Sequence, residues 1–361
     1  MALRFLMGTI IFDQDIALYY KYGSLLLQGK PVAAEYPELA IVFWGIAAYI
    51  SGSLTTFRFA YPILMLPFGC LTVYLLHKTG LRFGSSELGS ASALLYALSP
   101  FTAIFWMFKF DEVATSFLMV GLYALVLQKH RLTGLSAAIG FLIKWFPALV
   151  LPSALVFFAR KSTRATLELL GIFSGIVVAI VISYHAIWDG SYTFAYTFHA
   201  FRNINGESIY YLFEYLLTGN FIIPSGSPTP IYMTNSFVSS VMILAGIAWL
   251  ILLVRKANAS NFVYLSSLTV LLFLLVNKIY SVQYVLWFLP AVLTCFMQLK
   301  AKSQSTTLGI VAITLLEIFN YAKISTLSKW WIVASGCFWI SFAVTFSYLI
   351  MQLSNLSPIE T

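Results

Sequence analysis

The chain has 361 residues, of which 60% are hydrophobic and only 9% carry a charged side chain, and its mean hydropathy is +0.87. Because a soluble domain contains about 25% charged residues, this composition excludes an ordinary soluble fold and predicts a polytopic membrane protein. The formal net charge is +8, but the basic residues lie singly between apolar segments. They form no patch of the size that nucleic acid requires, so no nucleic-acid partner is expected.

Apolar stretches of transmembrane length recur along the chain. The first apolar run, residues 5–12, makes about 12 Å of helix, too short to span a bilayer, and has no small-residue cleavage site of a signal peptide. Later stretches match about 30 Å of hydrocarbon; they are 59–76, 88–108, 169–188, 231–254, 259–276 and 330–352. We expect an all-α polytopic transmembrane helical bundle of about 9–12 membrane segments, which forms one domain over residues 1–361.

The loops separate by charge if residues 39–57 form a re-entrant or interfacial hairpin and residues 133–159 form two short helices that meet near Trp145 and Pro147. One set of loops is then strongly basic, which indicates the cytoplasmic side. If both regions are instead single crossings, Lys129 and Arg131 face outward without an acidic neighbour. The basic set comprises Lys78, Arg82, Lys129, Arg131, Arg160, Lys161, Arg164, Arg255, Lys256, Lys300 and Lys302.

The two soluble-looking stretches, residues 12–38 and 189–230, are external in both topologies, so we expect chemistry on the non-cytoplasmic face of the cell membrane. In the first stretch, Asp15 and Tyr19 are four residues apart and share one face of a helix. A carboxylate beside an aromatic hydroxyl suits recognition and deprotonation of a sugar hydroxyl. The alternative is a solvated loop with interfacial tyrosines, in which Asp13 merely caps the helix.

Two further motifs contain basic residues in apolar surroundings. Lys109 and Asp111 lie between two apolar segments, where they bind substrate or form a self-neutralising turn with Asp111 as helix cap. Lys144 lies within the run Gly140-Phe-Leu-Ile-Lys-Trp-Phe-Pro, where an unpaired ammonium group is costly. It therefore needs an anion, such as a phosphate or pyrophosphate headgroup, or it snorkels to the outer interface.

A third polar motif begins at Asn277 and precedes an apolar segment. Lys278 is a candidate phosphate ligand, while Asn277 and Gln283 are candidates for hydrogen bonds to a sugar or a lipid carbonyl; a generic helix start is the alternative. No zinc-ligand spacing, phosphate-binding loop, dinucleotide turn or serine-nucleophile elbow is present, so nucleotide cofactors are not indicated. The cysteines lie in apolar runs without metal or redox spacing and are expected to be core residues; they are Cys70, Cys295 and Cys337.

These motifs together resemble the GT-C class of membrane glycosyltransferases, particularly glycosyltransferase family 87 and the related polyprenyl-phosphate-mannose mannosyltransferases. The resemblance follows the family's order over most of the chain. The matching motifs are Asp15-x-x-x-Tyr19, Gly29-Lys-Pro, Glu35-Tyr-Pro-Glu-Leu, Lys109-x-Asp111, Gly140-x-x-x-Lys144-x-x-Pro147 and Asn277-Lys-x-x-Ser-x-Gln-Tyr-x-Leu-Trp-x-x-Pro290.

The resemblance implies a hexosyltransferase, with mannose favoured, that takes a sugar from a polyprenyl phosphate in the bilayer and transfers it with inversion to a glycolipid or glycan. It further implies that Asp15 is the general base and that Lys144 and Lys278 surround the phosphate; Glu35 lies in a matching motif and is a candidate substrate ligand. No cofactor is expected, although a divalent metal at Asp13 and Asp15 stays open. The rival interpretations are a multi-pass transporter and a lipid flippase, for which helices broken by glycine and proline are also typical.

Overall fold

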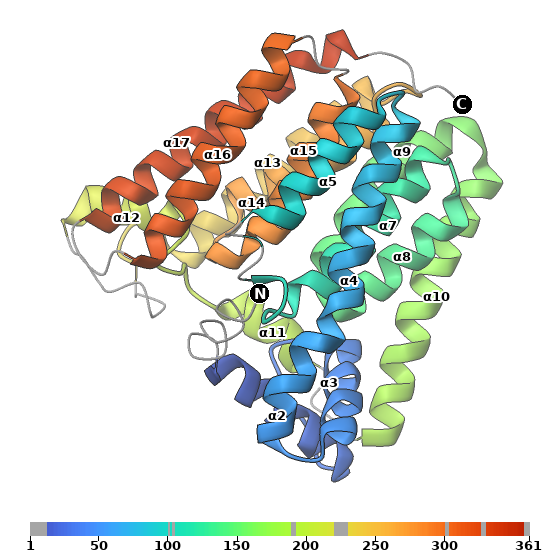
Figure 1. Cartoon of the computed structure of the whole chain (residues 1–361), viewed down its shortest axis with the longest axis vertical. Helices are drawn as coiled ribbons and strands as arrows, with labels where there is room; N and C mark the ends of the chain where they lie inside the picture. Colours follow the sequence, from blue (N-terminus) through green and yellow to red (C-terminus); the bar gives the residue numbers. More distant parts are fainter. Residues whose placement is uncertain are drawn as a thin grey trace.

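The computed structural model describes residues 13–99, 102, 105–188, 193–219, 230–299, 303–325 and 330–356. The described residues form helices and connecting segments without a β-strand (Figure 1). The helices are α2 (Asp13–Leu27), α3 (Glu38–Ser51), α4 (Leu54–Arg82), α5 (Ser86–Leu98), α7 (Asp111–Val126), α8 (His130–Ile143), α9 (Leu151–Lys161), α10 (Thr163–Trp188), α11 (Thr193–Phe201), α12 (Ile209–Thr218), α13 (Asn235–Lys256), α14 (Phe262–Val276), α15 (Val285–Gln298), α16 (Ser303–Ser325) and α17 (Trp330–Met351), with the 3-10 helices η1 (Phe146–Val150), η2 (Val282–Tyr284) and η3 (Gln352–Asn355).

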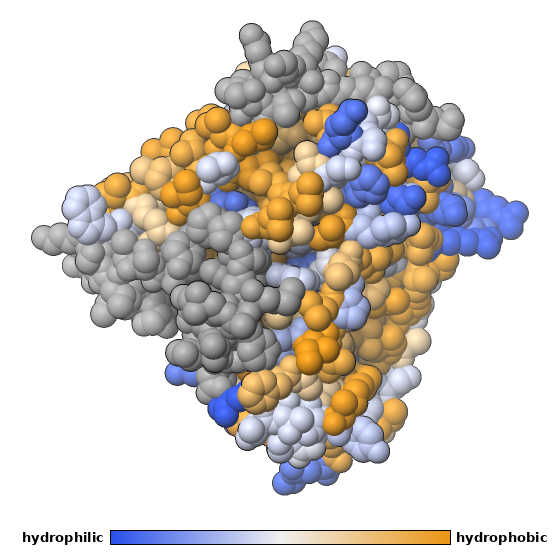
Figure 2. All heavy atoms as spheres, in the orientation of Figure 1, coloured by the Kyte–Doolittle hydropathy of each residue, from blue (hydrophilic) through white to orange (hydrophobic). Residues whose placement is uncertain are grey.

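Four of these helices, α4, α10, α13 and α17, are long and apolar enough to cross a membrane, and five shorter apolar helices accompany them. Their outer faces carry large exposed hydrophobic side chains, and Figure 2 shows broad orange areas over the flanks of the bundle. Such flanks are stable against lipid tails and unstable against water. The predicted all-α polytopic bundle is confirmed. The apolar run at residues 5–12 lies outside the described residues.

The predicted helix over residues 88–108 is wrong in its length. Helix α5 ends at Leu98, and Ser99 turns to an extended conformation with φ −55° and ψ 123°. Pro100 follows in the sequence, and a residue before proline is disfavoured in the α conformation. Phe108 and Phe110, just before the start of α7, are buried.

The predicted break within residues 133–159 is confirmed. Helix α8 ends at Ile143, Lys144 is extended with φ −163° and ψ 128°, and η1 contains Pro147 near its start. Proline lacks the N–H that would continue the helix. The chain after this break packs closely against α8, since a Cβ atom added at Gly140 would lie 2.5 Å from Cβ of Pro147. Glycine at position 140 therefore permits this approach.

The region 39–57 is a helix, a turn and the start of another helix. Helix α3 has 14 residues, or about 21 Å, which is shorter than the hydrocarbon core. It ends at Gly52 in the left-handed conformation with φ +67°, and the side chain of Ser53 caps α4. Helix α3 packs tightly on α2, where a Cβ atom at Gly23 would lie 2.2 Å from the Trp44 carbonyl oxygen. This geometry agrees with a hairpin.

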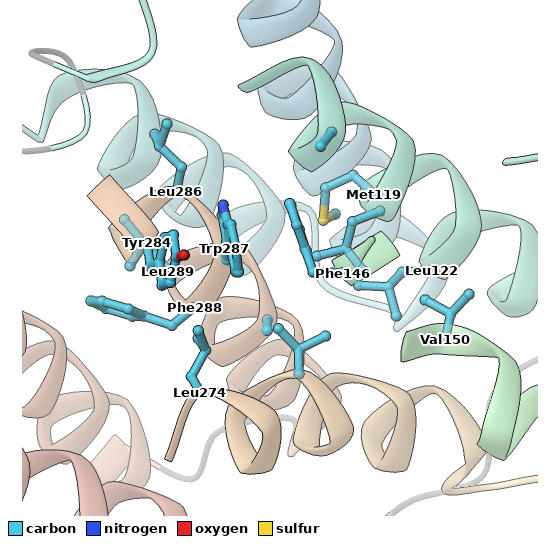
Figure 3. Close-up of a cluster of buried hydrophobic side chains, with 14 of the residues drawn as sticks. Met119, Leu122, Phe146, Val150, Leu274, Tyr284, Leu286, Trp287, Phe288 and Leu289 are labelled. Atoms are coloured by element: carbon cyan, nitrogen blue, oxygen red, sulfur yellow. The ribbon is translucent and has the colours of Figure 1, made fainter. Parts of the chain in front are cut away.

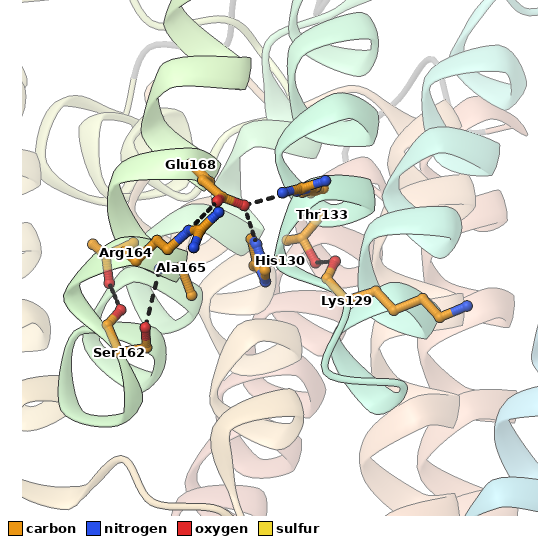
Figure 4. A network of polar contacts seen from close by, with 9 residues as sticks. Lys129, His130, Thr133, Ser162, Arg164, Ala165 and Glu168 are labelled. Atoms are coloured by element: carbon orange, nitrogen blue, oxygen red, sulfur yellow. Dashed lines mark hydrogen bonds and ion pairs between the residues drawn. The ribbon is translucent and has the colours of Figure 1, made fainter.

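Many of the predicted cytoplasmic basic residues gather at one end of the bundle. Glu168 accepts hydrogen bonds from His130 at 2.9 Å and from the guanidinium groups of Arg131 and Arg164 at 2.7 and 2.8 Å (Figure 4). Arg160 donates to the carbonyl oxygens of Val254 and Ala257. These contacts join the start of α8 to the start of α10, and the end of α9 to the end of α13.

Candidate active site

A cavity of about 730 Å³ lies where α2, the break before α7, the break after α8 and the segment after α14 meet. The predicted site residues that line it are Asp15, Glu35, Lys109, Lys144, Asn277, Lys278 and Gln283. Asp111 lies directly behind the wall and contacts two of them. Tyr19 is buried instead, with its ring stacked on Trp44 at 4.5 Å. The side chain of Asp13 is outside the described part of the structure.

Asp15 and Lys109 form an ion pair at the cavity wall. Asp15 lies in the first turn of α2, and Lys109 lies two residues before the start of α7. The Asp15 side chain is 38% exposed and that of Lys109 only 12%, so the carboxylate is the more accessible partner. The helix break after Ser99 places Lys109 here, because a continuous helix to residue 108 would carry it away from the end of α5.

Asp111 is a fully buried carboxylate whose two oxygens receive three side-chain hydrogen bonds. Lys144 Nζ and Trp287 Nε1 each donate to Oδ1 at 2.7 Å, and Gln283 Nε2 donates to Oδ2 at 3.0 Å. Asp111 is also the first residue of α7, where the helix dipole favours a negative charge. The N-cap position belongs to Phe110, so the Asp111 side chain does not cap the helix and instead joins two segments that are distant in sequence, one at Lys144 and one at residues 283–287.

Lys144 turns toward the protein interior. Its side chain is 16% exposed and is paired with Asp111. Three aromatic rings surround the ammonium group, with Nζ 5.5 Å from the ring centres of Tyr36 and Tyr284 and 5.0 Å from that of Trp287. Aromatic faces attract a cation. The anion that Lys144 requires within its apolar run is thus supplied, at least in part, by the protein itself.

The wall behind Lys144 consists of stacked aromatic side chains. The ring of Trp287 packs on Phe146 with centres 4.0 Å apart, and on Tyr284 with centres 3.7 Å apart. Figure 3 shows the rings of Trp287 and Phe146 facing one another, with the apolar side chains of Met119, Leu122 and Val150 on the far side of Phe146. Rings locked in this way leave little freedom to the residues that carry them, so Lys144 and Gln283 are presented on a rigid surface.

The second cationic side of the cavity contains Lys278 and Arg202. Lys278 Nζ donates to the carbonyl oxygen of Ala200 at 2.8 Å and to Oδ1 of Asn235 at 3.1 Å. Burial lowers the pKa of Lys278, and the nearby Arg202 guanidinium lowers it further. Within the described ranges, no carboxylate forms an ion pair with either residue. This side of the cavity is suited to an anionic group of a ligand.

His199 and its aromatic neighbours complete the cavity on the side of α11. Nε2 of His199 donates to the carbonyl oxygen of Glu35 at 2.9 Å. Burial lowers the pKa of His199 to about 4, assisted by the cations Arg202, Lys144 and Lys278, so the imidazole is neutral at pH 7. Its ring lies against Trp145, with centres 4.8 Å apart.

Sequence reasoning gave no clear role to Arg202 or His199 and none to Tyr196. These residues lie on α11 or directly after it, in a stretch whose composition resembles a solvated loop. The residues that they contact are far away in sequence. No periodicity or spacing connects Arg202 to Lys278. The described residues contain no group of three or more histidine, cysteine, aspartate or glutamate side chains that would bind a metal ion.

A family model described as glycosyltransferase family 87 matches residues 32–277. The match covers more than half of the chain, so the chain belongs to glycosyltransferase family 87 and is a membrane glycosyltransferase. The matched range includes Glu35, Lys109 and Lys144, whereas Asp15 precedes it and Lys278 follows it. Searches of curated proteins and of solved structures found no match.

The pair of Lys144 and Asp111 allows a test of how much the site contributes to stability. Asp111→Asn and Lys144→Met should each destabilise the protein by about 3–5 kcal/mol, since each leaves a buried partner unpaired. The double variant should lose less than the sum, because the two groups belong to one network. Thermal unfolding of the protein in nanodiscs measures all three.

Arg164→Met provides the matched control, since Arg164 pairs with Glu168 at an exposed position. An exposed ion pair contributes about 0–1 kcal/mol, so this variant should unfold close to the native temperature. Additive losses in the Asp111 and Lys144 double variant would show that the two residues act independently.

Proposed function

We propose that this family 87 glycosyltransferase transfers a hexose, with mannose favoured, from a polyprenyl-phosphate sugar to a glycolipid or glycan acceptor at the non-cytoplasmic face of the membrane. The observation that carries the proposal is that one cavity contains both a carboxylate, Asp15, and the cations Lys144, Lys278 and Arg202. A sugar transfer from a lipid phosphate requires both kinds of group. A soluble nucleotide donor is not proposed, because the chain contains no nucleotide-binding motif.

In the proposed reaction, Asp15 accepts the proton of the acceptor hydroxyl as its oxygen attacks the anomeric carbon of the donor sugar. The bond between that carbon and the phosphate oxygen breaks, and its electron pair stays on the phosphate. Attack from the side opposite the leaving group inverts the anomeric centre. A base within reach of the hydroxyl raises the rate by about 10²- to 10⁴-fold. Asp15 is suited to this role because its carboxylate is more exposed to the cavity than its partner Lys109.

The developing charge on the leaving phosphate needs stabilisation in a site with little water. Lys278 and Arg202 are suited to this role because no carboxylate of the described residues neutralises them. Lys144 is already paired with Asp111 and contributes a smaller share of net positive charge. Since protein cations suffice to offset the phosphate in this scheme, no metal cofactor is proposed.

Transfer of labelled sugar by purified protein tests the base. Asp15→Asn should lower transfer by about 10²–10⁴, because an amide cannot accept the proton, while binding of the polyprenyl-phosphate donor stays close to native. The assay also separates transfer from transport or lipid flipping, which leave the glycosidic bond intact. The control is Glu87→Gln, an exposed carboxylate at the start of α5, which should transfer sugar at the native rate. Full activity of Asp15→Asn would exclude Asp15 as the base.

Binding of the donor to detergent-purified variants tests the phosphate site. Lys278→Met should weaken binding by about 1–3 kcal/mol, the contribution of a hydrogen bond that involves a charged group. Lys144→Met should weaken it less, because Asp111 already offsets that charge. If both residues contact one phosphate, the double variant should lose less than the sum. Lys256→Met, at the opposite and basic end of α13, should bind normally; unchanged affinity in Lys278→Met would place the phosphate elsewhere.

The orientation in the membrane is testable with single cysteines in a protein whose three native cysteines are replaced by alanine. A cysteine at Thr55, an exposed residue at the start of α4, should react with an impermeant maleimide in intact cells. A cysteine at Thr163, at the start of α10 among the basic residues, should react only after permeabilisation. The reverse pattern would place the cavity on the cytoplasmic side and contradict the proposed donor face.

A further inference from the structure

We propose that Glu35, together with the rings of Trp145 and Tyr196, forms a subsite for a neutral hexopyranose ring of the acceptor. This proposal rests on the proposed function, since it assigns the acceptor side of the same cavity. It concerns recognition and adds no chemical step. Its physical basis is the contrast between Glu35 and the other carboxylates of the site.

Glu35 is the cavity carboxylate without an internal partner. Asp15 is paired with Lys109, and Asp111 with Lys144. Glu35 lines the cavity and is half-buried, but no group in the described part of the chain donates a hydrogen bond to its carboxylate. Its backbone is nevertheless held in place, because His199 donates to its carbonyl oxygen. A fixed backbone with an unengaged carboxylate is the arrangement expected of a ligand-binding residue.

The charge of Glu35 determines which part of the substrates it can contact. A phosphate near an unpaired carboxylate is repelled, and the repulsion is strong where water is scarce. The donor phosphate is therefore best placed beside Lys278 and Arg202, and the side of Glu35 is left to an uncharged group. Hydroxyl groups are good donors to a carboxylate, and such charge-assisted hydrogen bonds are stronger than neutral ones.

The aromatic rings near Glu35 offer an apolar surface to a sugar ring. Trp145 and Tyr196 lie nearly parallel, with an interplanar angle of 5° and centres 5.5 Å apart, and both line the cavity. His199 connects them to Glu35, since its ring packs on Trp145 while its Nε2 donates to the Glu35 carbonyl.

A pyranose ring combines an apolar C–H face with a rim of hydroxyl groups. Aromatic side chains that carry one polar group suit such amphipathic ligands, and a few polar groups placed in an apolar pocket set orientation and specificity. The Glu35 carboxylate would accept from the hydroxyls, and the rings of Trp145 and Tyr196 would contact the C–H face. An alkyl chain offers no donor to the carboxylate, and a phosphate is repelled by it.

Saturation-transfer NMR with the full chain in nanodiscs tests this subsite without any donor. The probes are the methyl α-glycosides of mannose, glucose and galactose. At least one of them should receive saturation in the native protein, at ring C–H protons. Glu35→Gln should weaken its affinity about tenfold or more, since a charge-assisted hydrogen bond is replaced by a neutral one. Trp145→Leu should reduce the saturation of the C–H protons.

Glu87→Gln is the matched control, and its affinity should equal that of the native protein. Size-exclusion profiles and thermal unfolding verify that the variants are folded, and Glu35→Asp, which keeps the charge but shortens the side chain, gives a second measurement if Glu35→Gln does not fold. In the transfer assay, Glu35→Gln should raise the KM for the acceptor and leave the donor affinity unchanged.

The proposal is overturned if no methyl glycoside receives saturation, or if Glu35→Gln binds sugar as tightly as Glu87→Gln. Failure of the proposed function has a different signature. In that case the methyl glycosides bind in a manner dependent on Glu35, but no sugar is transferred from any polyprenyl-phosphate donor. Normal transfer with sugar binding that is independent of Glu35 removes only the acceptor subsite.

Discussion

The buried carboxylate of Asp111 is the constraint on which the rest of the site depends. An isolated charge inside an apolar bundle is costly, and partners that donate hydrogen bonds to it must therefore come from the surrounding helices. Asp111 obtains them from Lys144 and from Gln283 and Trp287. Satisfying one charge thus holds the start of α7, the break after α8 and the start of α15 with the 3-10 helix before it in one place.

The same constraint explains where the helices are irregular. Inside a membrane, backbone outside a regular helix is tolerated only where protein or a water-filled cavity surrounds it. The breaks after Leu98, after Ile143 and after Val276 all lead to the cavity or to its wall. Each break also delivers a polar side chain there, respectively Lys109, Lys144 and Lys278. Short helices and interrupted segments are therefore the means by which this bundle builds a polar site between apolar helices.

Charge pairing divides the cavity into a self-neutralised part and a part with unpaired groups. Lys109 and Lys144 have carboxylate partners, which orient them without leaving much net charge for a ligand. Lys278 and Arg202 have none among the described residues, and the Glu35 carboxylate is likewise unengaged. The unpaired cations favour an anionic ligand group, and the unpaired carboxylate favours a neutral, hydroxyl-bearing one. This difference in charge is the physical basis of the proposed donor and acceptor subsites.

The sequence by itself determined the membrane class, the helical fold and the break near Pro147, because apolar length and proline chemistry are local properties. It also identified Asp15, Lys109 and Lys144 as unusual polar residues, since a charge in an apolar surrounding is visible without a structure. It did not determine their partners. The pairing of Lys144 with Asp111, the inward position of Tyr19 and the approach of Arg202 and His199 to Lys278 and Glu35 depend on helices packed across long sequence separations. Only the tertiary structure decides such contacts, because they follow from how helices that are distant in sequence pack around one buried space.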